Sequence, residues 1–134
     1  MNISKFTQKS VQAVQDLEKV AYEYGNQEIE QEHLLYTLLT QEDSLILKLI
    51  EKMEINKEYF LNTVKNALDA KVKVSGGELR FGQYLNKALV NAEDEAKAMG
   101  DEYVSVEHLF LSLLKYPSPG MKKYWSEFGI TKER

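Results

Sequence analysis

The feature that most constrains the fold of this 134-residue chain is an internal duplication. A shift of 75 residues moves Phe6 onto Phe81 and carries the first half of the chain over the second without a gap. Self-similarity at a fixed spacing is the signature of a repeat architecture. The matched pairs include Ala13 and Ala88, Gly25 and Gly100, Ile29 and Val104, Glu32 and Glu107, His33 and His108, and Leu38 and Leu113. The chain is therefore predicted to contain two copies of one folding unit.

The first copy is predicted to be helical, because its apolar side chains recur at three- and four-residue steps. Between these stripes lie residues that typically end a helix in the left-handed conformation and residues that typically cap the start of the next one. We expect a long helix that ends at Gly25-Asn26, and a short helix that carries Leu34, Leu35, Leu38 and Leu39. A third helix, capped by Asp43 or Ser44, is expected to bury Leu45, Ile46, Leu49, Ile50 and Met53, and a fourth is expected from Asn56 to about Asp69.

The second copy repeats this order up to its last unit. A long helix is expected over 82–99, Ser105 can cap the next one, and the segment Tyr116–Gly120 breaks the chain before a third. Thr131 stands where Asn56 begins the fourth helix of the first copy, yet only three residues follow it. We therefore expect a piece cut from a longer polypeptide, with a frayed C-terminus.

These elements predict one all-α domain over 1–134, made of two pseudo-symmetric four-helix repeats. The second repeat is truncated at its last helix. Repeat one covers about 1–70, a glycine-containing linker about 71–79, and repeat two about 80–134.

Composition and charge exclude several classes of protein. The net charge is −4 and no basic stripe is present, which disfavours binding to nucleic acid or to an anionic membrane. No apolar run is long enough to span a bilayer, and the chain has no cysteine for disulfide or thiol chemistry. A cytoplasmic domain is therefore expected. The chain also shows no heptad seam, so the domain by itself is expected to be a monomer.

Catalytic and cofactor motifs are absent from the sequence. It contains no Gly-x-x-x-x-Gly-Lys-Ser/Thr loop, so the domain is expected to bind and hydrolyse no nucleotide. His33 and His108 occupy equivalent repeat positions but do not form the His-Glu-x-x-His arrangement of a zinc helix. A pseudo-twofold axis could bring both to one metal, whereas each could equally pack at a helix end. We favour packing, and expect no metal, cofactor or catalytic residue.

Two glutamates and a threonine are the candidate binding residues. Glu32 and Glu107 each fall in the first turn of a predicted helix, where the helix dipole stabilises a carboxylate by about 0.3–1 kcal/mol. Alternatively, the two carboxylates bind cationic groups of a partner. Thr7 can cap the first helix. The residues themselves leave both interpretations open.

The duplicated segments resemble a known family. Ile29-Glu30-Gln31-Glu32-His33-Leu34-Leu35 and Val104-Ser105-Val106-Glu107-His108-Leu109-Phe110 resemble the paired signatures of the Clp amino-terminal domain. Within that family, the stretch from Gln41 to Met53 is similar to the ClpB branch.

This resemblance implies a domain of eight helices that captures unfolded or aggregated polypeptide. The remainder of its own chain would supply two ATPase modules that bind ATP and magnesium and assemble into a hexamer. Three positions linked to client handling in ClpB-type domains match Thr7, Asp101 and Glu107. Related ClpC domains read phosphoarginine with threonines and glutamates, and Thr7, Glu32 and Glu107 match that pattern. Gly82 replaces the second threonine, which leaves at most one complete site.

Two alternatives stay open at the level of the sequence. One is a domain of the ClpC or ClpA kind, which binds adaptors or phosphoarginine-tagged clients for proteolysis. The other is a free-standing Clp-repeat binding protein without a motor. The reading frame downstream of Arg134 would distinguish them.

Overall fold

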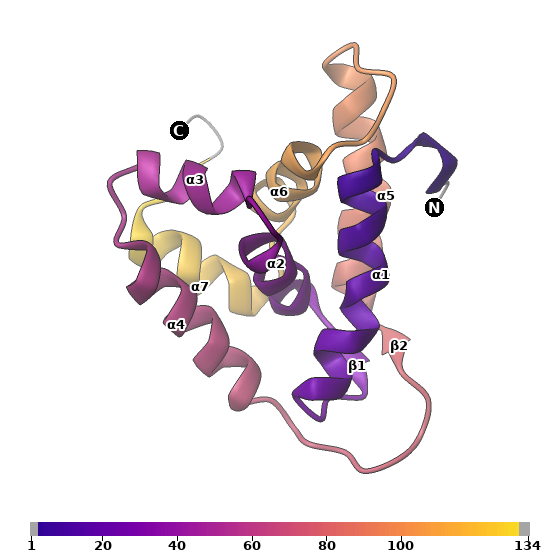
Figure 1. Cartoon of the computed structure of the whole chain (residues 1–134), viewed down its shortest axis with the longest axis vertical. Helices are drawn as coiled ribbons and strands as arrows, with labels where there is room; N and C mark the ends of the chain where they lie inside the picture. Colours follow the sequence, from indigo (N-terminus) through magenta and orange to yellow (C-terminus); the bar gives the residue numbers. More distant parts are fainter. Residues whose placement is uncertain (1–2, 132–134) are drawn as a thin grey trace.

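Helices build both repeats, as Figure 1 shows for the computed structural model, which describes residues 3–131. Repeat one holds α1 (Gln8–Glu23), α2 (Gln31–Thr40), α3 (Leu45–Lys52) and α4 (Lys57–Asp69), and repeat two holds α5 (Gln83–Ala98), α6 (Val106–Lys115) and α7 (Pro119–Phe128). A short 3-10 turn, Ile3–Lys5, precedes α1. The 75-residue shift carries the bounds of α1 onto α5 and those of α2 onto α6, residue for residue. The all-α fold with two repeats is confirmed. The predicted start of an eighth helix after Thr131, and the frayed end, lie outside the described residues.

Side-chain caps fix where the helices begin. The hydroxyl of Thr7 accepts a hydrogen bond from Ser10 N at 3.2 Å, and the amide oxygen of Asn56 accepts one from Tyr59 N at 3.0 Å. Of the two candidates for α3, Ser44 is the cap, because its hydroxyl accepts from Leu47 N at 3.0 Å. Asp43 instead adopts a left-handed backbone with φ of 56°, which turns the chain into the helix.

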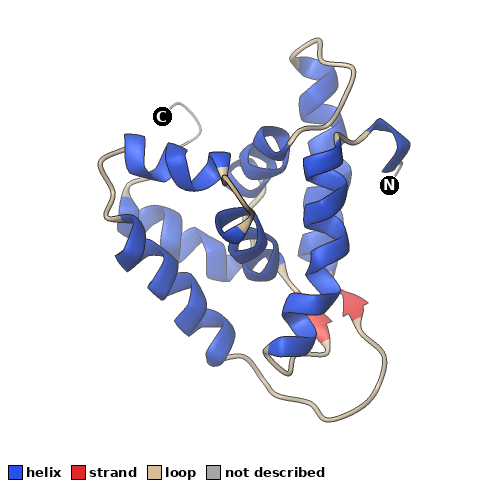
Figure 2. Ribbon diagram, in the orientation of Figure 1, coloured by secondary structure: helices blue, strands red, loops and turns tan. Residues whose placement is uncertain are grey.

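Two short parallel backbone pairings join the repeats, and the helical periodicity of the sequence did not predict them. β1 (Glu28–Ile29) pairs with β2 (Arg80–Phe81), the strands drawn in red in Figure 2. The 75-residue shift converts the pair Ile29–Phe81 into the pair Val104–Phe6, which is also a parallel bridge. Each repeat therefore begins by pairing with the other repeat, which fixes their relative orientation.

The core is one continuous cluster of apolar side chains around α2 and α6, the two helices at the centre of Figure 1. Its fully buried members include Leu17, Leu34, Leu38, Phe60, Leu85, Leu89, Leu109 and Leu113. The prediction for α3 was partly wrong. Ile46 and Ile50 are buried one turn apart, but Leu45 is 41% exposed. A helix of this length presents only one stripe to the core, and Leu45 lies beside that stripe.

Within residues 3–131, no helix combines the length and the apolar character needed to cross a membrane.

Candidate functional site

A cleft of about 470 Å³ opens where the two repeats meet, and we call it the seam cleft. It lies between the first turn of α1, the first turn of α6 and the loop that connects α2 to α3, which come together in the upper half of Figure 1. Its lining residues are Thr7, Gln8, Lys9, Gln41, Asp43, Leu45, Ser105, Val106 and Glu107. Two of the four predicted site residues, Thr7 and Glu107, therefore share one cavity although 100 positions separate them in the sequence.

The backbone bridge between the repeats brings these two residues together. Thr7 N donates to Val104 O at 3.0 Å, and Val104 N donates to Lys5 O at 2.7 Å. Thr7 then caps α1, while Ser105 caps α6 directly after Val104. Both helices consequently start from the same short pairing, with their N-terminal ends at the cleft.

The cleft has an apolar floor and an acidic rim. Leu45 and Val106 supply the floor, with Leu45 partly exposed and Val106 largely buried. Glu107 lies on the first turn of α6 with an exposed side chain, and among residues 3–131 it has no ion-pair partner. Asp43 lies on the opposite loop, where its carboxylate is 88% exposed and 3.7 Å from Lys48. The rim thus offers two solvated carboxylates beside an apolar surface.

Lys9, which also lines the cleft, is bonded to the α2–α3 loop. Lys9 Nζ donates to Glu42 O at 2.7 Å, and Lys9 O accepts from Gln41 Nε2 at 2.9 Å. These two bonds attach the α2–α3 loop to α1. They also keep the ammonium on the loop backbone instead of on Glu107, so the carboxylate stays available.

The apolar surface continues beyond the cleft along the outer side of α3. A second hollow of about 400 Å³ is lined by Leu45, Lys48, Leu49, Glu51 and Lys52. Leu45 lines both cavities, so the two are adjacent. An extended segment could lie across Val106, Leu45 and Leu49 in turn.

Asp101, the third predicted residue, does not line the cleft. Its carboxylate is 2.8 Å from His108 Nε2, and His108 Nδ1 accepts from Ser105 N at 2.9 Å. Because Nδ1 accepts a backbone proton, the ring proton is on Nε2 and is donated to Asp101. Asp101 is thus connected to the start of α6 through the histidine.

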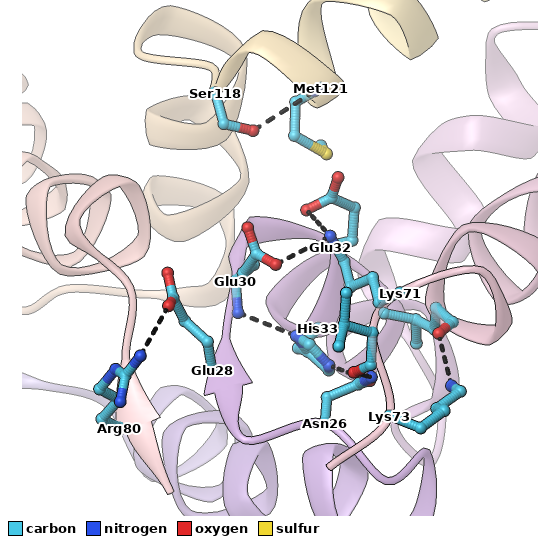
Figure 3. Close-up of polar contacts among 12 residues, drawn as sticks. Asn26, Glu28, Glu30, Glu32, His33, Lys71, Lys73, Arg80, Ser118 and Met121 are labelled. Atoms are coloured by element: carbon cyan, nitrogen blue, oxygen red, sulfur yellow. Dashed lines mark hydrogen bonds and ion pairs between the residues drawn. The ribbon is translucent and has the colours of Figure 1, made fainter.

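Glu32, the fourth predicted residue, lies in a separate, buried polar cluster. Its carboxylate is 7% exposed and lies 3.4 Å from Lys71 Nζ, which is also 3.1 Å from Glu30 (Figure 3). Burial lowers the pKa of Lys71, but the charges and hydrogen bonds of Glu32 and Glu30 outweigh it and raise the pKa overall. The structure therefore separates the two repeat-related glutamates: Glu32 is neutralised inside and Glu107 is exposed outside.

Both histidines occupy the ends of helices. His33 Nδ1 accepts from Glu30 N at 2.8 Å and His33 Nε2 is 2.9 Å from Asn26 Oδ1, the same arrangement that His108 makes with Ser105 and Asp101. Burial lowers the pKa of His33 to about 4, and the charge of Lys71 adds to this effect. In the described range 3–131, no group of three histidine, aspartate or glutamate side chains is placed to bind a metal.

Sequence reasoning missed the apolar floor and the loop of the cleft. Leu45 was assigned to the core, and Gln41, Asp43 and Val106 carried no functional signal of their own. One pattern could have indicated that Leu45 is exposed. Ile46 and Ile50 form the buried stripe of α3, and Leu45, the first residue after the cap Ser44, lies on a different side of the helix. The convergence of the loop with α1 and α6 depends on tertiary packing, which no local pattern encodes.

Comparisons with known proteins agree on the kind of domain. The family model described as the Clp repeat (R) N-terminal domain matches residues 5–128. A chaperone protein ClpB from Nitratidesulfovibrio vulgaris is 38% identical over 140 aligned residues, which cover 100% of this chain and 16% of that protein. The chain thus spans about one sixth of the length of this relative.

Solved structures share the fold at lower sequence identity. The Hsp104 N-terminal domain from Candida albicans superimposes with a TM-score of 0.83 at 20% identity, covering 96% of this chain and 85% of that one. A ClpV N-domain, solved in complex with VipB peptide, gives a TM-score of 0.75 at 19% identity, with coverage of 98% and 82%.

Proposed function

Because the chain belongs to the Clp repeat N-terminal domain family, with ClpB chaperones among its relatives, we propose that it captures unfolded or aggregated polypeptide at the seam cleft for an ATP-dependent disaggregase. The observation that carries this proposal is the cleft itself, which unites Thr7 and Glu107 around the exposed part of Leu45. The ATPase modules, their ATP and magnesium, and a hexameric assembly would belong to the rest of a ClpB-type chain.

The lining defines the class of client segment. An apolar floor next to two carboxylates suits an extended stretch in which an apolar residue neighbours a lysine or arginine. Fully burying a leucine contributes about 1.5–3 kcal/mol, so covering the 41% of Leu45 that is exposed contributes about 1 kcal/mol. A solvated ion pair with Glu107 contributes a similar or smaller amount, about 0.2–1 kcal/mol. Binding is consequently weak and tolerant of sequence, as capture and release of many clients requires.

The relation to peptide-binding neighbours supports the proposal. The ClpV N-domain, which has the same fold, was solved in complex with VipB peptide, so this architecture can hold a peptide segment. Within our chain, the hollow along α3 provides the additional length that such a segment needs.

A pair of unstructured peptides tests the proposal. One contains leucine and arginine, and the other carries citrulline in place of each arginine, which removes the positive charge and keeps the shape. We expect the leucine–arginine peptide to bind more tightly by fluorescence anisotropy. Glu107→Gln should weaken it twofold to fivefold and abolish the preference over citrulline. Leu45→Ala should weaken both peptides about fivefold, in line with the lost contact of about 1 kcal/mol.

Matched variants away from the cleft serve as controls. Glu58 is also an exposed glutamate in the first turn of a helix, α4, and Val90 is also a half-exposed apolar residue, on α5. Glu58→Gln and Val90→Ala should leave the affinity unchanged. Equal losses for Glu107→Gln and Glu58→Gln would contradict the proposal, because the cleft would then have no special role.

A further inference from the structure

The duplication predicts a second cleft, related to the first by the 75-residue shift. Gly82 caps α5 where Thr7 caps α1, and Gly82 N donates to Ile29 O at 2.8 Å as Thr7 N donates to Val104 O at 3.0 Å. The backbone frame of the seam cleft therefore exists twice. The counterparts of its lining residues include Gly82, Tyr84, Tyr116, Ser118, Gln31 and Glu32.

Gln31 fills the space at the second position. Its side chain is fully buried, with Nε2 donating to Tyr84 O and to Tyr116 O, both at 3.0 Å, and Oε1 accepting from Ser118 N at 2.8 Å. One amide group thus joins α5, the end of α6 and the start of α7. The equivalent residue in repeat two is Val106, which has no polar atoms for such bonds and leaves the seam cleft open.

Glu32 already has a cationic partner from the chain itself. Lys71, at the start of the linker, places Nζ 3.4 Å from Glu32 and 3.1 Å from Glu30. Figure 3 shows the three side chains pointing toward one another. On the other side of the carboxylate, a Cβ added at Gly120 would lie 2.8 Å from Glu32 Oε2. Gly120 is the counterpart of Leu45. The second cleft therefore has no side chain where the open cleft has its apolar floor, and the Glu32 carboxylate occupies that space.

We infer that a closed copy of the seam cleft lies at the second junction between the repeats, where Gln31 and Lys71 occupy the places that a client segment takes in the open one. Lys71 is an internal substitute for the basic residue of the client, and Gln31 replaces the client's backbone contacts. The domain therefore binds one client segment at a time despite its two repeats. This inference rests on the proposed function of the seam cleft.

Titration calorimetry with the leucine–arginine peptide measures the number of sites. We expect one peptide per domain, and backbone amide shifts in NMR spectra at Thr7, Val106 and Glu107 but not at Glu32, Gly82 and Gly120. The double variant Glu32→Gln/Lys71→Met removes both members of the ion pair and should keep the same affinity and stoichiometry. Two peptides bound to the unmodified domain, or shifts at Glu32 and Gly82, would overturn the inference.

Opening the closed copy provides the positive test. Gln31→Val copies Val106, and Lys71→Met frees the Glu32 carboxylate. If the double variant retains a cooperative thermal transition, it should bind a second leucine–arginine peptide, more weakly than the seam cleft because Gly120 supplies no apolar floor, and raise the stoichiometry from one to two. A folded double variant that still binds a single peptide would show that these two residues do not close the site.

A third measurement is independent of any client. The side-chain amide protons of Gln31 should exchange with solvent far more slowly than those of Gln12, an exposed glutamine that donates to Asp16. Equal exchange rates would overturn the closure even if no peptide binds. Conversely, slow exchange at Gln31 with no peptide binding anywhere would leave the closed copy intact and refute the proposed function alone.

Discussion

The Nε2 atoms of the two repeat-related histidines face different partners. Both accept a backbone N–H on Nδ1, but Nε2 of His33 faces the amide oxygen of Asn26, whereas Nε2 of His108 faces the carboxylate of Asp101. The two histidines therefore have the same hydrogen-bond geometry, but the group that faces Nε2 is neutral for His33 and a carboxylate for His108. Since the uncharged version is enough to hold His33, we expect the contact of Asp101 with His108 to require an acceptor and not a negative charge.

Replacement of Asp101 distinguishes its role as a hydrogen-bond acceptor for His108 from a role of its negative charge. Asp101→Asn keeps an acceptor for His108 and should change the free energy of unfolding by less than about 0.5 kcal/mol. Asp101→Ala removes it and should cost about 1 kcal/mol, the usual value for a partly exposed hydrogen bond. Denaturant melts and peptide anisotropy of both variants measure this. If Asp101 binds clients through its charge, the asparagine variant will lose as much affinity as the alanine variant.

The low pKa of His33 makes the stability depend on pH. In the folded chain the pKa is lowered to about 4 from the ordinary value near 6.5, so between these values the unfolded chain binds the additional proton. The stabilisation is complete above about pH 6.5 and is lost as the pH falls towards 4, by about 3 kcal/mol in total. Urea melts at intervals between pH 7 and 5 should show stability falling along this range. His33→Gln should flatten the slope; an unchanged slope would assign the dependence to other groups.

Among the elements, α2 and α6 lie at the centre of the shared core. Leu38 on α2 and Leu113 on α6 are repeat-related and both fully buried. Truncation of either to alanine should destabilise the domain by about 2–5 kcal/mol, because it removes buried methyl groups and leaves a cavity. Leu45→Ala, on the partly exposed side of α3, should cost less than about 1.5 kcal/mol. Guanidinium melts of the three variants measure the difference, and a cost below about 0.5 kcal/mol for Leu38→Ala would contradict the assigned core.

Several helix bounds could be predicted from the sequence because local signals determine them, whereas α7 begins at Pro119, inside the segment Tyr116–Gly120 that is expected to break the chain. Asn56 as cap and Asp69 as the end of α4 match the structure, and so does Ser105 at the start of α6. The short pairings β1–β2 and Phe6–Val104 could not be predicted, because two residues of extended chain carry no periodicity. Thr7 and Glu107 could be selected as candidates from the sequence. That Asp101 lies apart from them could not be predicted, because the pairing of the two repeats determines which residues line the cleft.

At the scale of the whole molecule, the two repeats depend on each other. Besides the crossed pairings, α2 contacts both α5 and α6, and α1 contacts α6, so one apolar cluster extends through both halves. A single repeat would expose half of this cluster to water. The repeat is thus a unit of sequence, and the pair of repeats is the unit of folding.

Separate fragments test this dependence. Peptides covering 1–78 and 79–134 should each show low helicity and no cooperative thermal transition in circular dichroism. An equimolar mixture should regain helicity, because the crossed pairings and the core can re-form between two chains. A cooperative transition in the first fragment alone would mean that repeat one folds independently.

The crossed pairing also has a consequence for the order of events during synthesis on the ribosome. Thr7 is translated long before Val104, yet the carbonyl that receives its N–H belongs to Val104. The start of α1 must therefore wait, unpaired, while most of the domain is translated. A nascent chain that stalls before Val104 would present the exposed core surface of repeat one, and would itself resemble the clients that we propose this domain captures.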